Sequence, residues 1–138
     1  MSYNTNTIFL IPSFVMMEFF KTINTSVSKE KLHQLFTLQN LENYTNLVFK
    51  IGSLNQNEAE IGGIWGEFTL LRIETINGVR FLLKECPYAL TWSISTDIKK
   101  EQISIHLTVS RETIKPDFNV EIEEFMKDMS RCIIEYTK

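Results

Sequence analysis

Two histidines and two cysteines are the residues of this 138-residue chain best suited to catalysis or metal binding. His33 and His106 stand alone, without further ligands at a metal-binding spacing, so we expect no metal site. His33 lies among polar residues and is expected to be exposed. His106 falls on the polar side of an alternating segment, where a neutral imidazole could serve as a general acid or base. No partner for His106 can be identified from the sequence.

Motifs for a nucleophile or a cofactor are absent from the sequence. Cys86 and Cys132 lie far apart, outside a CxxC spacing, and no histidine partner can be identified for either. We expect free thiols in the cytoplasm. The chain has no G-x-S-x-G motif, and the glycines at 62, 63 and 66 lack the lysine of a phosphate loop. We therefore predict no cofactor and favour a protein that is not an enzyme, while leaving catalysis open.

The acidic residues form no recognisable catalytic pair. Paired carboxylates need facing positions and environments that separate their pKa values, which a sequence does not reveal. A solvated sheet face is the simpler interpretation of the following residues: Glu58, Glu60, Glu67 and Glu74.

Aromatic and cationic side chains in apolar segments are better candidates for a binding site. The indoles of Trp65 and Trp92 and the phenol of Tyr88 combine apolar area with one polar group, which suits orienting a ligand in a hydrophobic pocket. Arg72 interrupts an apolar strand; we expect it to face solvent, and the alternative is an inward orientation toward a ligand carboxylate. All these aromatic residues could instead fill the core, as could the methionines of the last helix. The candidate ligand-binding residues are Trp65, Arg72, Tyr88, Trp92, Phe125 and Met129.

Alternating apolar residues predict a series of strands between residues 47 and 109. Polar residues 52–57 predict a turn. Asn77-Gly78 separates two apolar runs and predicts a hairpin, because both central residues of such a turn need positive φ. Residues 118–136 then predict an amphipathic helix, with Asp117 or Asn119 as its N-cap. Its apolar stripe consists of Ile122, Phe125, Met126, Met129 and Ile133.

The N-terminal third predicts a strand followed by two short helices. Residues 14–22 favour a strand, with a helix as the alternative for residues 15–20. Ser28 is expected to cap a helix that ends at Phe36, and a second short helix or an irregular turn is expected near residues 40–43. Residues 1–14 are expected to form an arm or an extra strand, and residues 15–138 a single domain.

The composition argues against several classes of partner. The formal net charge is -3 and no basic stripe is present, so nucleic-acid binding is not indicated. The apolar segment 8–20 contains Pro12 and Glu18 and lacks a basic start and a cleavage site. It therefore resembles neither a signal peptide nor a membrane span. These features predict a cytoplasmic protein without stable membrane insertion.

Three segments resemble the START-like (SRPBCC) superfamily, the helix-grip proteins that include polyketide cyclase-like and birch-pollen-type lipid carriers. Residues 17–26 (MEFFKTINTS) resemble its first strand, residues 29–44 its pair of short helices, and residues 89–94 (ALTWSI), after Pro87, a late strand. With the C-terminal helix, the similarity covers residues 15–138 in outline. The resemblance implies a hydrophobic small molecule bound between the sheet and the long helix; some members are cyclases, and others bind protein partners.

The elements and the resemblance together predict an α+β fold. It is an antiparallel curved sheet gripping a long C-terminal helix, with two short helices after the first strand. The expected function is binding of a lipid or polyketide-like molecule in a cavity between sheet and helix. The alternatives are a protein-interaction or homodimerising module without ligand, and a cyclase- or hydrolase-type enzyme of the same superfamily.

Overall fold

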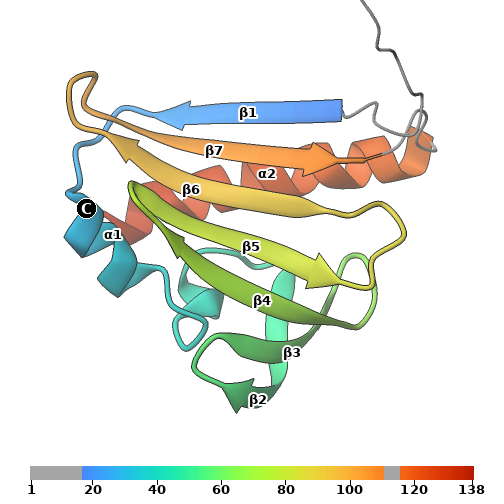
Figure 1. Ribbon diagram of the computed structural model, residues 1–138. Helices are drawn as coiled ribbons and strands as arrows, with labels where there is room; N and C mark the ends of the chain where they lie inside the picture. Colours follow the sequence, from blue (N-terminus) through green and yellow to red (C-terminus); the bar gives the residue numbers. More distant parts are fainter. Residues whose placement is uncertain (1–16, 111–115) are drawn as a thin grey trace, which may run out of the picture.

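The computed structural model describes residues 17–110 and 116–138, so the arm predicted for residues 1–14 lies outside the described residues. The elements follow the predicted order of one strand, two short helices, consecutive strands and a long helix (Figure 1). They are β1 (Met17–Ile23), α1 (Lys29–Leu35), the 3-10 helix η2 (Leu41–Asn43), β2 (Val48–Asn55), β3 (Glu58–Gly63), β4 (Phe68–Thr75), β5 (Gly78–Lys84), β6 (Thr91–Asp97), β7 (Gln102–Val109) and α2 (Pro116–Tyr136).

The described strands form a seven-stranded antiparallel sheet in the order β1-β7-β6-β5-β4-β3-β2. The first strand pairs with the last, and β1 and β2 are the two edges of an open sheet. Burial alternates along β7 as the sequence predicted, with the residues from Ile103 to Val109 alternately buried and half-buried. An α+β class with an open antiparallel sheet and a C-terminal helix is therefore confirmed.

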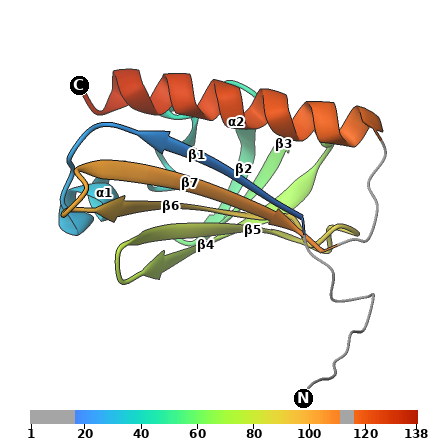
Figure 2. The same ribbon diagram turned by 90° about the horizontal axis from the view of Figure 1, so that it is seen from above.

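Helix α2 lies along one face of the sheet (Figure 2). Its predicted apolar stripe is buried, each member at 2% exposure or less. The predicted N-cap was wrong: the helix already begins at Pro116, so Asp117 lies within its first turn. Proline is favoured at this position because its fixed φ suits a helix and its missing N–H has no partner there. No helix in the described ranges is both long and apolar enough to cross a lipid bilayer.

The short helices are placed by local signals. The hydroxyl of Ser28 accepts a hydrogen bond of 3.0 Å from the backbone N–H of Lys31, which confirms the predicted cap of α1. Leu32 is the buried residue of this helix and anchors it to the core. The predicted second helix is the single turn η2, which buries Leu41.

Two turn predictions need correction. The hairpin at Asn77-Gly78 exists, but its loop residues are Ile76 and Asn77, because Gly78 already pairs with Thr75. Neither Asn77 nor Gly78 has a positive φ. Glycine is required at 78 for another reason, since a Cβ there would collide with the backbone carbonyl of Ile94 on β6.

The turn predicted for residues 52–57 is also shorter than expected. Strand β2 continues to Asn55, and register irregularities between Lys50 and Gly52 and between Ser53 and Asn55 accommodate its polar, bulged course. Because β2 is an edge strand with mostly exposed residues, its composition resembles that of a loop.

Candidate functional site

Four of the six candidate residues meet between α2 and the sheet. The ring centre of Phe125 on α2 lies 4.8 Å from that of Trp65 and 5.0 Å from that of Trp92, and the two indoles lie 6.3 Å apart. Tyr88 joins through Phe118, with ring centres at 4.3 Å, and Phe118 lies 6.4 Å from Trp65. We call these five residues the aromatic cluster.

The aromatic cluster runs from the core to the surface. Trp92 on β6 and Phe125 on α2 are 1% and 0% exposed. Trp65, Tyr88 and Phe118 are half-buried, and each lies outside the central strands: in the β3–β4 loop, in the β5–β6 loop and in the first turn of α2. The cluster therefore has an inner part that is shielded from water and an outer part that water reaches.

The two indole nitrogens of the aromatic cluster have no hydrogen-bond acceptor within residues 17–110 and 116–138. Nε1 of Trp65 and Nε1 of Trp92 are buried, and neither donates to any acceptor among the described residues. A buried donor left without an acceptor costs roughly 1–3 kcal/mol, so tryptophan N–H groups in protein interiors are normally paired. Two such donors in neighbouring rings are therefore an unusual feature of this region.

The outer aromatic residues are carried by loops with left-handed backbone conformations. Trp65 lies between Gly63 and Gly66, whose φ angles are 150° and 103°. Tyr88 lies between Glu85 and Ala89, which adopt φ angles of 63° and 49° without being glycine. Such conformations are uncommon for non-glycine residues and tend to occur at functional sites. Both loops thus adopt backbone conformations that sequence patterns do not reveal.

Phe118 was not among the site residues predicted from the sequence, whereas Met129 was. Phe118 precedes Ile122 by four residues and Phe125 by seven, so the helical spacing could have identified it. Met129 is fully buried, four residues after Phe125 on the same stripe. The structure brings together the aromatic candidates and places Met129 one turn further along the helix.

Arg72 lies apart from the aromatic cluster, and the expectation that it faces solvent was wrong. Its side chain is 5% exposed, and its Nε donates to the carbonyl oxygen of Phe36 at 2.7 Å. Its Nη2 donates to the carbonyl oxygen of His33 at 2.9 Å and to Glu74 Oε2 at 3.2 Å. Arg72 thus points inward and binds backbone carbonyls at the C-terminal end of α1.

The histidines do not belong to the aromatic cluster either. His33 is half-buried rather than exposed, with Nε2 2.9 Å from the carbonyl oxygen of Thr75. His106 lies on the opposite face of the sheet from α2, where Nε2 is 2.8 Å from Glu18 Oε1 and its ring stacks on Phe20 at 4.3 Å. No hydroxyl or thiol of the described residues is hydrogen-bonded to the His106 imidazole, so these residues assemble no nucleophile–base pair around it.

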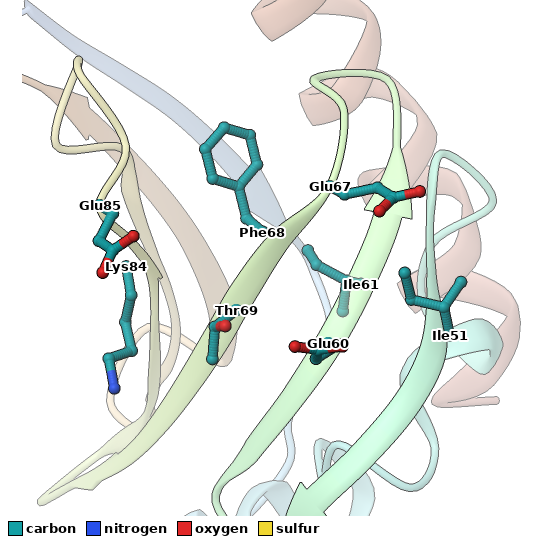
Figure 3. A pocket seen from close by; sticks show the side chains of 8 residues that line it. All are labelled: Ile51, Glu60, Ile61, Glu67, Phe68, Thr69, Lys84 and Glu85. Carbon is teal, nitrogen blue, oxygen red and sulfur yellow. The ribbon is translucent and has the colours of Figure 1, made fainter.

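A pocket of about 410 Å³ lies over strands β2 to β5 and is lined by three glutamates and Lys84 (Figure 3). Glu60 lies on β3 and Lys84 on β5, whereas Glu67 directly precedes β4 and Glu85 directly follows β5 (Figure 3). Lys84 Nζ binds Glu58 Oε2 at 2.9 Å, which lowers the pKa of Glu58 and raises that of Lys84. Within the described residues, no group of three or more histidines, cysteines and carboxylates could hold a metal ion.

Comparison with known proteins supports the fold without indicating an activity. No family model and no curated protein matches the chain. A solved structure of an uncharacterised protein from Bacillus thuringiensis is similar, with a TM-score of 0.57 and 7% sequence identity. The match covers 87% of this chain and 99% of that chain. The TM-score indicates a shared fold. At so low a sequence identity, function must be argued from the site.

Proposed function

We propose that this chain is a helix-grip protein that binds a hydrophobic small molecule carrying a hydrogen-bond acceptor in the aromatic cluster. The observation that carries the proposal is the pair of buried indole N–H groups of Trp65 and Trp92, which have no acceptor in the described part of the chain. A carbonyl, hydroxyl or ether oxygen lodged among these rings would pair with donors that are otherwise costly. The surrounding rings supply the apolar contact that such pockets typically provide.

The order of elements supports the helix-grip part of the proposal. Strand β1 lies beside β7, the two short helices follow β1, and α2 follows β7 and covers the face that carries Trp92. This is the arrangement that the sequence resemblance implied. The fold shared with the Bacillus thuringiensis protein is consistent with it, although that protein indicates no ligand.

A ligand enters by displacing rings, because the aromatic cluster is closely packed. The side chains best placed to move are the half-buried ones, Trp65 on its loop between two glycines and the stacked pair Tyr88 and Phe118. The apolar surface of the ligand then replaces the surface of these rings in the interior. Burial contributes about 25 cal/mol per Å² of apolar area, so a ligand of larger area than the displaced ring favours the exchange.

Tryptophan fluorescence tests the proposal directly, because Trp65 and Trp92 are the two tryptophans of the chain. We would titrate the protein with anilinonaphthalene sulfonate and then displace this dye with a fatty acid and with an aromatic polyketide. Replacing Trp65 by Phe keeps an aromatic ring and removes the N–H donor. For a ligand with a carbonyl acceptor we expect roughly tenfold weaker binding to W65F, the value of one hydrogen bond.

Two controls make the result specific. The substitution Phe20→Leu alters an aromatic residue that is 64% exposed on the other face of the sheet and should leave binding unchanged. A hydrocarbon without an acceptor should bind wild type and W65F equally. If no ligand changes the tryptophan emission, or if F20L weakens binding as much as W65F, the proposal is wrong. A buried water molecule that accepts hydrogen bonds from the indole N–H groups would give this negative result, because the donors would then already be paired.

A second candidate function is self-association through the edge strand β2. Three large apolar residues of this strand are about half exposed: Phe49 at 46%, Ile51 at 51% and Leu54 at 54%. An edge strand with exposed apolar residues can pair with the same strand of a second copy. Light scattering should then show a dimer in the wild type and a monomer in Ile51→Lys. A wild-type monomer at high concentration would exclude this candidate.

A further inference from the structure

A second pocket lies on the α2 side of the sheet, at the opposite end of β3 from Trp65. Its volume is about 600 Å³, and its walls come from the end of α1 and the chain after it, from β2 with its following turn, from Ala59 of β3, and from β4. Trp65 lies beyond the end of β3 at Gly63. Asn55 and Gln56, which line this pocket, lie before its start at Glu58. The pocket is therefore separate from the aromatic cluster, and its role is independent of the function proposed for that cluster.

Arg72 is the buried cation of this pocket. Two of its nitrogens are engaged, Nε with Phe36 and Nη2 with His33 and Glu74. The third, Nη1, makes no hydrogen bond to any residue in the described part of the chain, although the side chain is only 5% exposed and lines the pocket. A guanidinium carries five N–H donors, so two of them remain available at Nη1. The contacts of Nε and Nη2 with backbone carbonyls orient the guanidinium, and Nη1 has no partner among the described residues.

The charged residues that line the pocket give it a net positive charge. Lys50 is the second cation, and its Nζ donates to the carbonyl oxygen of Gln39 at 3.2 Å, which uses one of three donors. Glu74 is the carboxylate of the lining; it is 54% exposed and contacts Nη2 of Arg72. His33 also lines the pocket, and its Nε2 faces the carbonyl of Thr75. Neutral hydroxyl and amide groups make up most of the other polar lining, from Thr37, Gln39, Ser53, Asn55 and Gln56.

We propose that this pocket binds the carboxylate of a small, polyhydroxylated molecule. Nη1 of Arg72 donates to the carboxylate from the pocket lining, and Lys50 adds the second positive charge. The hydroxyl and amide groups of the lining pair with the hydroxyls of the ligand. Glu74 beside the guanidinium disfavours a doubly charged anion, so a single carboxylate fits the charge balance better than a phosphate dianion.

An NMR titration distinguishes the classes of ligand. The probes are gluconate, which carries hydroxyls and one carboxylate, glucose, which is neutral and of similar size, and inorganic phosphate. Gluconate should shift the amide signals of residues 37–39, 50–56 and 72–74 at millimolar concentration, and glucose should not. If gluconate shifts no signals of these segments, or if phosphate binds there more tightly than gluconate, the proposed ligand class is wrong.

Charge substitutions then test the site itself. Lys50→Gln should weaken gluconate binding about three- to fivefold, and Glu74→Gln should tighten it by a similar factor, which is the range expected for partly exposed charges. Lys84→Gln is the matched control, because it removes the same charge from the other face of the sheet. Equal effects of K50Q and K84Q would show non-specific attraction and overturn the proposal. We avoid substituting Arg72, because its loss would leave carbonyls of α1 unpaired and could unfold the protein.

Discussion

The hydroxyl of Thr45 donates a hydrogen bond of 2.9 Å to Oδ2 of Asp128, across 83 positions of the chain. The same carboxylate accepts from the backbone N–H of Asn46 at 2.9 Å and from its side-chain Nδ2 at 3.1 Å. Asp128 is 5% exposed on α2, on the helix side that faces the core. These three bonds satisfy a buried carboxylate and fasten α2 to the segment between η2 and β2.

We predict that Asp128→Asn destabilises the protein by about 2 kcal/mol, because the amide cannot accept all three bonds and leaves a buried donor unpaired. Urea denaturation measures the loss as a lower midpoint at an unchanged slope. Glu124→Gln is the control, since Glu124 is exposed on the same helix and should change stability by less than about 0.5 kcal/mol. Equal midpoints for D128N and E124Q would show that the three bonds contribute nothing to stability.

The sequence predicts the elements held by local signals and misses those set by distant partners. Alternation identified β7, and Ser28 identified the start of α1, because both depend on residues within a few positions. Part of the polar edge strand β2 was mistaken for a turn. Most of its residues are exposed, so they need not alternate between apolar and polar types. The orientation of Arg72 was missed because its acceptors, at Phe36 and His33, lie more than thirty positions away.

For the candidate site, the types of its residues could be predicted from the sequence, but their geometry could not. Aromatic residues with a polar group were sensible candidates, and Trp65, Tyr88, Trp92 and Phe125 do lie together. That both indole donors find no acceptor among the residues described follows from the packing of α2 against the sheet, which no local pattern encodes. The separate pocket around Arg72 depends equally on the tertiary approach of α1 to β4.

Gly78 and Gly66 should respond very differently to replacement by alanine. At Gly78 a Cβ would lie 2.7 Å from the Cα of Ser95 and collide with the carbonyl of Ile94, so β5 and β6 must separate. We expect G78A to lose about 3 kcal/mol or more, as overpacking against backbone does. At Gly66 a Cβ would have no heavy atom within 4 Å from the described residues other than its chain neighbours, and the φ angle of 103° is the source of strain. G66A should lose about 1–2 kcal/mol.

Thermal unfolding of both variants measures the difference. A larger loss of melting temperature in G66A than in G78A would contradict the assigned roles. It would mean that the β5–β6 contact relaxes more easily than the loop that carries Trp65.

Tyr44 should make the protein sensitive to alkaline pH. Burial raises the pKa of its phenol well above the usual range, and the hydroxyl donates to the carbonyl oxygen of Thr37 at 2.6 Å. In the unfolded chain the phenol ionises near pH 10. The folded state therefore holds a proton that the unfolded state releases, and stability falls as the pH rises above about 10.

The matched variant is Tyr44→Phe, which fills the same space without a titratable group. It should be less stable than the wild type at neutral pH by about 1 kcal/mol, because the hydrogen bond to Thr37 is lost. Its stability should fall less steeply in the alkaline range. Denaturant midpoints measured for both proteins from neutral to alkaline pH check this. Parallel curves would show that Tyr44 does not contribute to the alkaline loss.

Cys132 should be an unreactive thiol. Burial raises its pKa, and the negative charge of Asp128, whose Oδ1 lies 3.9 Å from Sγ, raises it further. Because the thiolate is the reactive form, a raised pKa lowers the rate of alkylation at a given pH. In the Cys86→Ser background we therefore expect Cys132 to react with iodoacetamide several times more slowly than an unhindered thiol, as followed by mass spectrometry.

Removing the charge of Asp128 separates the electrostatic cause from simple burial. In D128N the carboxylate is replaced by a neutral amide, so the pKa of Cys132 should fall and the midpoint of the pH–rate profile for alkylation should move to lower pH. A faster reaction alone would not suffice, because a less stable protein opens more often and exposes the thiol at every pH. A rate that rises without a shift of the midpoint would assign the protection of Cys132 to burial, and the charge of Asp128 would have no part in it.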